Sequence, residues 1–173
     1  MRALLLIGLS VSLCMNAAQG AEPAIATHAP VAVPSDKEAV SGLKEIKMIF
    51  DFNVSDPKKM LDRLELIEQT RDGIARNGLT PSIVVAFRGI ASRYTQKDPS
   101  LYKPEETVIA AKIHDKIAAM SQDARLDLNQ CALANSKQKV KNEDTFAELK
   151  LVTNSFITIG AYQNKGYAYV MLD

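Results

Sequence analysis

The sequence lacks the motifs on which several common enzymatic chemistries depend. It contains neither the G-x-G-x-x-G pattern of dinucleotide-binding folds nor the G-x-x-x-x-G-K-S/T pattern of P-loops. It has only 2 histidines and 2 cysteines, and their positions match neither a metal-ligand spacing nor a Cys–His catalytic pair. We therefore expect no nucleotide cofactor and no bound metal.

An excess of charge of one sign is also missing. The net charge is +1, although 24% of the residues are charged. Such a balance favours neither nucleic acid nor an anionic membrane surface as a partner. The hydrophobic fraction of 47% is ordinary for a soluble globular protein.

The first 20 residues are interpreted as a secretory signal peptide. A basic residue is followed by an apolar run over residues 3–15, and then by the small residues Ala18 and Gly20 that a signal peptidase accepts. The run is shorter than the roughly 20 residues that a membrane span needs. An uncleaved anchor and a lipid attachment at Cys14 are the alternatives. Export places the protein in an oxidising compartment, and we expect the periplasm.

Residues 21–42 are expected to form a flexible tether, and residues 43–173 a single domain. The tether holds Pro23, Pro30 and Pro34 among alanines and small polar residues, without a periodic apolar pattern. The remaining residues have the length of one domain.

Predicted strands and helices alternate through this domain. We expect strands within 43–54, 81–89, 124–130, 148–154 and 167–173, and helices within 56–78, 104–123, 131–141 and 155–166. Asp56 is expected to cap the first helix and Gly78 to end it. The order predicts an α/β fold with a single, mostly parallel five-stranded sheet flanked by helices, layered as in flavodoxin.

Two aspartates near the end of the first strand allow a comparison with receiver domains. Asp51 and Asp56 lie where such domains place acidic residues, but the position after the third strand, where a phosphoacceptor aspartate belongs, is occupied by "NQC". We therefore attribute Asp56 to helix capping and Asp51 to a hydrated loop.

Cys131 is the most informative single residue, because it lies where the third strand gives way to a helix. In a parallel sheet, sites form beyond the carboxyl ends of the strands. A helix N-terminus favours the thiolate, which is the nucleophilic form. A small buried hydrophobe is the alternative interpretation. Asn129 and Arg88 lie at the same predicted edge as candidates for polar contacts, although Arg88 also fits a solvated strand-end charge.

Two segments stand out, "LDLNQCALANS" around Cys131 and "LVTNSFITIGAYQNKGYAYVMLD" at the end of the domain. The first resembles the cysteine-bearing strand and helix of the DsrE/DsrF-like family of sulfur-relay proteins, and the second is similar to that family's closing helix and strand. The segments "KMIFDFNVSDPKKMLDRLELIEQ" and "SIVVAFRGIA" fit its first strand, first helix and second strand. The resemblance implies that Cys131 accepts sulfur as a persulfide, that donor and acceptor proteins or small sulfane-sulfur compounds are its partners, and that the chain forms homo-oligomers.

Two hypotheses follow from the sequence. The first is a periplasmic sulfur-binding or sulfur-transfer protein in which Cys131 carries the sulfur, more a carrier than an enzyme with turnover. The alternative is a non-catalytic binding or assembly module of the same fold, in which Cys131 only packs.

Overall fold

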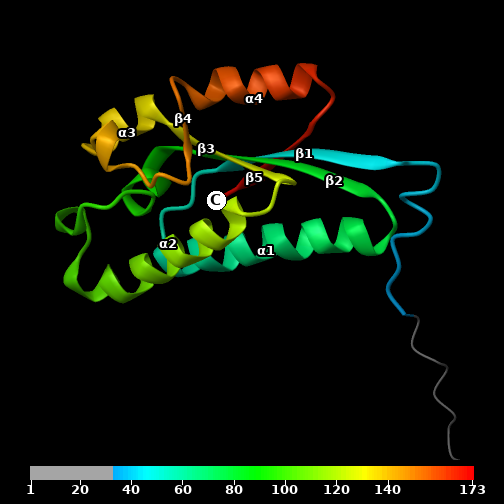
Figure 1. Ribbon diagram of the computed structural model, residues 1–173, viewed down its shortest axis with the longest axis horizontal. Coiled ribbons are helices and arrows are strands. Elements are labelled where there is room, and N and C mark those ends of the chain that lie inside the picture. The colour runs from blue at the N-terminus through cyan, green and yellow to red at the C-terminus, as the bar shows by residue number, and fades with distance from the viewer. Residues whose placement is uncertain (1–32) are drawn as a thin grey trace, which may run out of the picture. The chain divides into compact units, whose positions relative to one another are not determined.

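Five parallel strands form the centre of the protein and follow the order β4-β3-β2-β1-β5 across the sheet (Figure 1). The computed structural model describes residues 33–173, so the expected signal peptide and the first part of the expected tether lie outside the described residues. Each neighbouring pair of strands is parallel, which confirms the predicted single-domain α/β fold. The strands are β1 (Glu45–Phe52), β2 (Thr80–Phe87), β3 (Leu126–Cys131), β4 (Lys150–Val152) and β5 (Ala168–Leu172).

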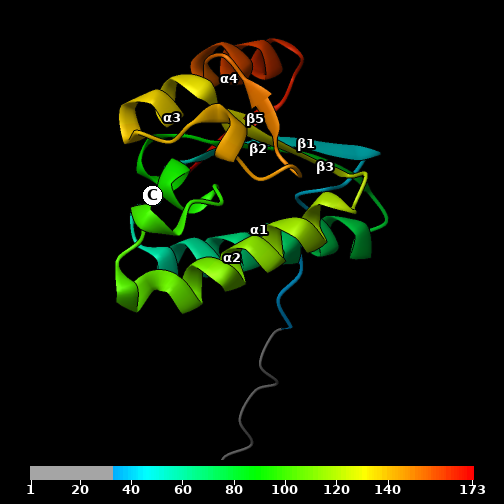
Figure 2. The ribbon, with the colours of Figure 1, turned by 60° about the vertical axis from the view of Figure 1, so that its left-hand side comes forward.

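Helices cover both faces of the sheet. In the described part of the chain, α1 (Pro57–Arg76) and α2 (Thr107–Ser121) lie on one face, and α3 (Ala132–Gln138) and α4 (Ser155–Asn164) lie on the other (Figure 1, Figure 2). No helix within residues 33–173 has the length and apolar character that a membrane crossing requires. Short 3₁₀ turns lie in the connections: η1 (Gly89–Tyr94), η2 (Pro99–Leu101), η3 (Pro104–Glu106) and η4 (Asn142–Asp144).

Helix α1 begins and ends as the sequence predicts. The Asp56 carboxylate accepts the backbone N–H groups of Lys58 at 2.7 Å and Lys59 at 3.2 Å, so it caps the helix. Pro57 occupies the first turn, where its missing N–H costs nothing. Gly78, with φ of +79°, ends the segment in a conformation that suits glycine. The buried positions of α1 are Met60, Leu64, Ile67 and Ile74.

The main apolar core lies between the sheet and the pair α1 and α2. Alternate strand residues point to this face, because successive side chains of a strand lie on opposite faces. The cluster therefore combines residues from the four strands β1, β2, β3 and β5 with the buried side of both helices. Its fully buried members include Phe52, Val54, Met60, Leu64, Ile67, Val85, Phe87, Ile113 and Ile117.

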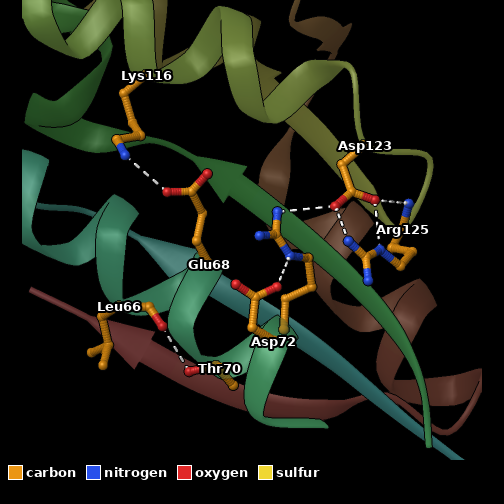
Figure 3. A network of polar contacts seen from close by, with 8 residues as sticks. Leu66, Glu68, Thr70, Asp72, Lys116, Asp123 and Arg125 are labelled. Atoms are coloured by element: carbon orange, nitrogen blue, oxygen red, sulfur yellow. Dashed lines mark hydrogen bonds and ion pairs between the residues drawn. The ribbon is translucent and has the colours of Figure 1, made fainter. Parts of the chain in front are cut away.

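Partly exposed ion pairs join α1 to α2 and to the turn that follows α2 (Figure 3). The Lys116 ammonium on α2 lies 2.9 Å from the Glu68 carboxylate on α1. Arg71 on α1 lies 2.9 Å from Asp123, whose other close partner is Arg125 at 2.6 Å. Partly exposed pairs of this kind contribute at most about 1 kcal/mol each. The apolar cluster, not these pairs, therefore carries most of the stability of the layer.

The opposite face is covered more thinly. Its apolar cluster contains Ile49, Val84 and Ala86 from the sheet and Ile159 from α4. Edge strand β5 and the first turn of α4 leave large apolar side chains in solvent: Phe156 is 63% exposed, Ile157 67%, Tyr169 44% and Met171 56%.

Regular structure starts shortly before β1. The backbone N–H of Val40 donates to the carbonyl of Asp36 at 3.1 Å, and that of Leu43 donates to the carbonyl of Val40 at 3.1 Å. Val40 also packs against the main core. The last residues of the expected tether therefore form hydrogen-bonded turns.

Candidate functional site

A pocket of about 250 Å³ lies beyond the carboxyl ends of β2, β3 and β4. Cys131 closes β3 and caps α3, Arg88 follows β2, and β4 leads into α4. The pocket therefore occupies the edge of the sheet where parallel α/β folds place their sites. It is lined by Arg88, Gly89, Cys131, Leu133, Ala134, Lys137, Asn154, Ser155 and Phe156.

The Cys131 sulfur receives hydrogen bonds from the first turns of two helices. The N–H of Ala134 in α3 lies 3.4 Å from the sulfur, and the N–H of Ser155 in α4 lies 3.3 Å from it. Cys131 is only 4% exposed. Burial acts to raise the pKa of the thiol, but the Ser155 side chain close to the sulfur and the backbone N–H groups of Ser155, Ala134 and Leu133 outweigh it, so the pKa is lowered. The folded chain thus favours the thiolate.

The residue before Cys131 is fixed by a buried polar network. The Gln130 amide donates to the Ser92 hydroxyl at 2.7 Å and to the Asn135 side-chain carbonyl at 2.8 Å. The side-chain carbonyl of Gln130 accepts a hydrogen bond from the Thr95 hydroxyl at 2.6 Å. Gln130 itself is fully buried. Such a satisfied network holds one arrangement of the β3–α3 junction, and with it the position of the sulfur.

Arg88 reaches the pocket as part of a buried ion pair. Its Nε and Nη2 donate to the two carboxylate oxygens of Asp51, the Nη2 bond measuring 2.7 Å, and the Tyr169 hydroxyl donates to the same carboxylate at 2.7 Å. The guanidinium lies 4.9 Å from the centre of the Phe156 ring. The hydrogen bond to Asp51 raises the pKa of Arg88, so its charge is permanent.

The interpretation of Asp51 as a hydrated loop residue is wrong. Strand β1 continues to Phe52, and Asp51 is 2% exposed inside it. Its register partner on β2 is Ala86, two residues before Arg88, so both charged side chains lie on the same face of the sheet. The ion pair explains how a carboxylate tolerates this burial.

Gly89 is required where β2 turns beside the pocket. Its φ is +59°, and a Cβ atom there would lie 1.8 Å from the Asn53 side-chain oxygen. That oxygen accepts the N–H of Ile90 at 3.3 Å. Only glycine allows the chain to pass this close to Asn53 while Arg88 stays at the pocket.

The structure brings two of the three predicted site residues to one pocket. Cys131 and Arg88 both line it. Asn129 is 1% exposed, donates from its side chain to the Asp127 carbonyl at 3.1 Å, and does not line the pocket. Within residues 33–173, no group of three or more His, Cys, Asp or Glu side chains is arranged to hold a metal ion.

Two residues that line the pocket, Ser155 and Lys137, were not among the site residues predicted from the sequence. Ser155 begins α4 directly after β4, which is the same strand-to-helix junction that singled out Cys131. The expectation that sites form beyond the carboxyl ends of parallel strands, applied to both junctions, would have found it. Lys137 lies in the last turn of α3, and because α3 has only 7 residues its side chain still lines the pocket.

Comparisons with known proteins support the fold. No protein-family model matches the chain. An uncharacterized protein of Aquifex aeolicus (strain VF5) is 26% identical over 125 residues, which cover 72% of this chain and 55% of that protein. The chain therefore spans about half the length of this relative. A solved structure of a protein of unknown function from Methanobacterium thermoautotrophicum has a TM-score of 0.55 and 15% identity, over 74% of this chain and 100% of the other. That likeness shows a shared fold.

Proposed function

We propose that this protein is an exported sulfur carrier of the DsrE/DsrF-like type, which holds sulfane sulfur as a persulfide on Cys131 in the periplasm. The observation that carries the proposal is the environment of the Cys131 sulfur. Two helix N-termini donate to it at 3.3 and 3.4 Å, beside a pocket with room for additional sulfur atoms. This environment favours an anionic sulfur, which both a thiolate and a persulfide provide.

Loading follows from thiol exchange chemistry. The Cys131 thiolate attacks the terminal sulfur of a donor persulfide R–S–SH. A bond forms between Cys131 Sγ and that sulfur, the S–S bond of the donor breaks, and R–S⁻ leaves with the bonding electron pair. Unloading is the same exchange with an acceptor thiolate as the attacking group. Cys131 then leaves as a thiolate, and the hydrogen bonds from Ala134 and Ser155 stabilise it.

A single cysteine suits a carrier. Among residues 33–173 Cys131 is the one cysteine, and it forms no disulfide. No second thiol in this part of the chain competes for the bound sulfur. The sulfur therefore stays on Cys131 until a thiol of another molecule accepts it, which is what a relay step requires.

Membership of the DsrE/DsrF-like family is part of the proposal. It is supported by the resemblance of the β3–α3 and α4–β5 segments and by an all-parallel sheet of five strands with Cys131 at a strand end. The signal-like N-terminus and the oxidising compartment that it implies support the periplasmic assignment.

An assembly module is the second candidate function. The observation that favours it is the group of exposed apolar side chains on α4 and β5, with Ile157 67% and Met171 56% exposed. Large apolar side chains that gather in solvent in this way favour an interaction site. A second copy of the chain would cover it, and the Ile157→Glu and Met171→Glu variants would then dissociate in size-exclusion chromatography with light scattering.

The test of the carrier is the reactivity of Cys131. The rate of alkylation measured against pH should rise to a plateau with a midpoint below the ordinary thiol value of 9.0, because the folded protein favours the thiolate. Incubation with polysulfide should add the mass of one sulfur atom, and Cys131→Ser should abolish the gain. A thiol that labels only after unfolding and gains no sulfur would overturn the carrier and leave the assembly module.

A further inference from the structure

One buried polar atom at the Cys131 pocket, the Ser155 hydroxyl oxygen, has no hydrogen-bond partner. Ser155 is fully buried, and its hydroxyl oxygen is the one buried side-chain nitrogen or oxygen within residues 33–173 that has no hydrogen-bond partner. Nearly all buried polar groups in native proteins are paired, because an unpaired one is costly. An unpaired hydroxyl beside a reactive thiol therefore indicates a partner that arrives with the ligand.

The position of Ser155 identifies that partner. Its backbone N–H donates to the Cys131 sulfur at 3.3 Å, and its side chain also interacts with that sulfur, although without the geometry of an ordinary hydrogen bond. Ser155 lines the same pocket as Cys131. A persulfide places a second sulfur about 2 Å from Sγ, the length of an S–S bond. That atom offers the hydroxyl an acceptor position that Sγ does not.

We infer that Ser155 is a positioning residue for the carried sulfur: its hydroxyl donates a hydrogen bond to the terminal sulfur of the Cys131 persulfide and holds it inside the pocket. The inference rests on the proposed carrier function and adds a residue and a binding geometry to it. The hydroxyl acts as a hydrogen-bond donor and gives up no proton.

Different hydrogen-bond donors then bind the two sulfur atoms of the persulfide. The backbone N–H groups of Ala134 and Ser155 donate to Sγ, the atom that leaves as a thiolate when an acceptor takes the sulfur. The Ser155 hydroxyl donates to the terminal sulfur, the atom that the acceptor attacks. Losing the hydroxyl should therefore shorten the lifetime of the persulfide while leaving Cys131 able to form it.

The experiment compares variants that differ by one hydroxyl group. Wild-type protein, Ser155→Ala, Ser155→Thr and Thr158→Ala are loaded with polysulfide, freed of excess donor, and followed by intact mass. Thr158→Ala is the matched control, because Thr158 lies on the same helix with its hydroxyl bonded only to the Asn154 carbonyl at 3.5 Å. The alkylation rate of unloaded Cys131 is measured against pH for each variant, together with its melting temperature.

Ser155→Ala should load but lose its persulfide about tenfold faster, which is the effect of one hydrogen bond to an anionic group. Its alkylation midpoint should also rise, since one group that favours the thiolate is gone. Ser155→Thr should keep most of the lifetime because it keeps the hydroxyl, and Thr158→Ala should match wild type.

Either of two results would overturn the inference, and they are distinguishable. Equal persulfide lifetimes in Ser155→Ala and wild type, at equal melting temperatures, would remove the role of Ser155 and leave the carrier intact. A wild-type protein that takes up no sulfur from polysulfide would overturn the carrier proposal itself.

Discussion

On one face of the sheet, α1 and α2 bury a continuous apolar cluster, and partly exposed ion pairs join the two helices (Figure 3). On the other face, α3 and α4 cover a small apolar cluster, a buried Asp51–Arg88 pair and a thiol held by two helix N-termini. The first arrangement is what burial of apolar area alone would produce. The second tolerates an unpaired hydroxyl and exposed aromatic side chains. The difference indicates that the α1 and α2 face supplies most of the folding stability, whereas the α3 and α4 face holds the candidate site.

The largest effect should come from the α1 and α2 face. Leu64→Ala removes a fully buried side chain from the main core, and we expect a loss of about 2–5 kcal/mol in the free energy of unfolding, measured with urea. The alkylation profile of native Cys131 should stay unchanged, because Leu64 lies across the sheet from it. A shifted profile would contradict the division between the faces.

Asp51→Asn should change both the free energy of unfolding and the pH dependence of Cys131 alkylation. It leaves the Arg88 guanidinium without its carboxylate, which we expect to cost about 3 kcal/mol, the low end for a broken buried pair, because the Arg88 side chain is 20% exposed. The unbalanced positive charge beside Cys131 should move the alkylation midpoint to lower pH.

Tyr169→Phe is the matched control for Asp51→Asn, since it removes one hydrogen bond to the same carboxylate and leaves the ion pair in place. It should cost about 1 kcal/mol and leave the midpoint close to that of wild type. An unchanged midpoint in Asp51→Asn would show that Arg88 does not act on the thiol.

The smallest effect should come from the partly exposed ion pairs of the α1 and α2 layer. Hydrogen bonds from Arg125 hold the pKa of Asp123 at about 2, below its ordinary 3.8. The contribution of this carboxylate is therefore present above about pH 4 and is lost as the pH falls through about 2. We expect Asp123→Asn to lower the free energy of unfolding by less than about 1 kcal/mol at neutral pH. Below about pH 2 the substitution should have no effect, and urea unfolding at both pH values measures the difference. A larger loss than that of Leu64→Ala would reverse the roles assigned to core and surface.

The local sequence predicted the elements that depend on near neighbours. Asp56, Pro57 and Gly78 define α1 because a cap, a first-turn proline and a left-handed terminal residue act within a few positions of each other. The strand-to-helix junction at Cys131 was predicted for the same reason. Asp51 was misinterpreted because its partner, Arg88, follows the neighbouring strand and meets it only when β1 and β2 align.

The sequence by itself determined the order of strands and helices, the parallel α/β architecture and the position of Cys131 at a strand end, since apolar periodicity and capping are local properties. Only the tertiary structure decided what surrounds the sulfur. The N–H and hydroxyl groups of Ser155 belong to a helix 24 residues further along the chain. They reach Cys131 because β4 pairs with β3 and delivers α4 to the same edge of the sheet. A contact that depends on strand pairing leaves no local pattern in the sequence.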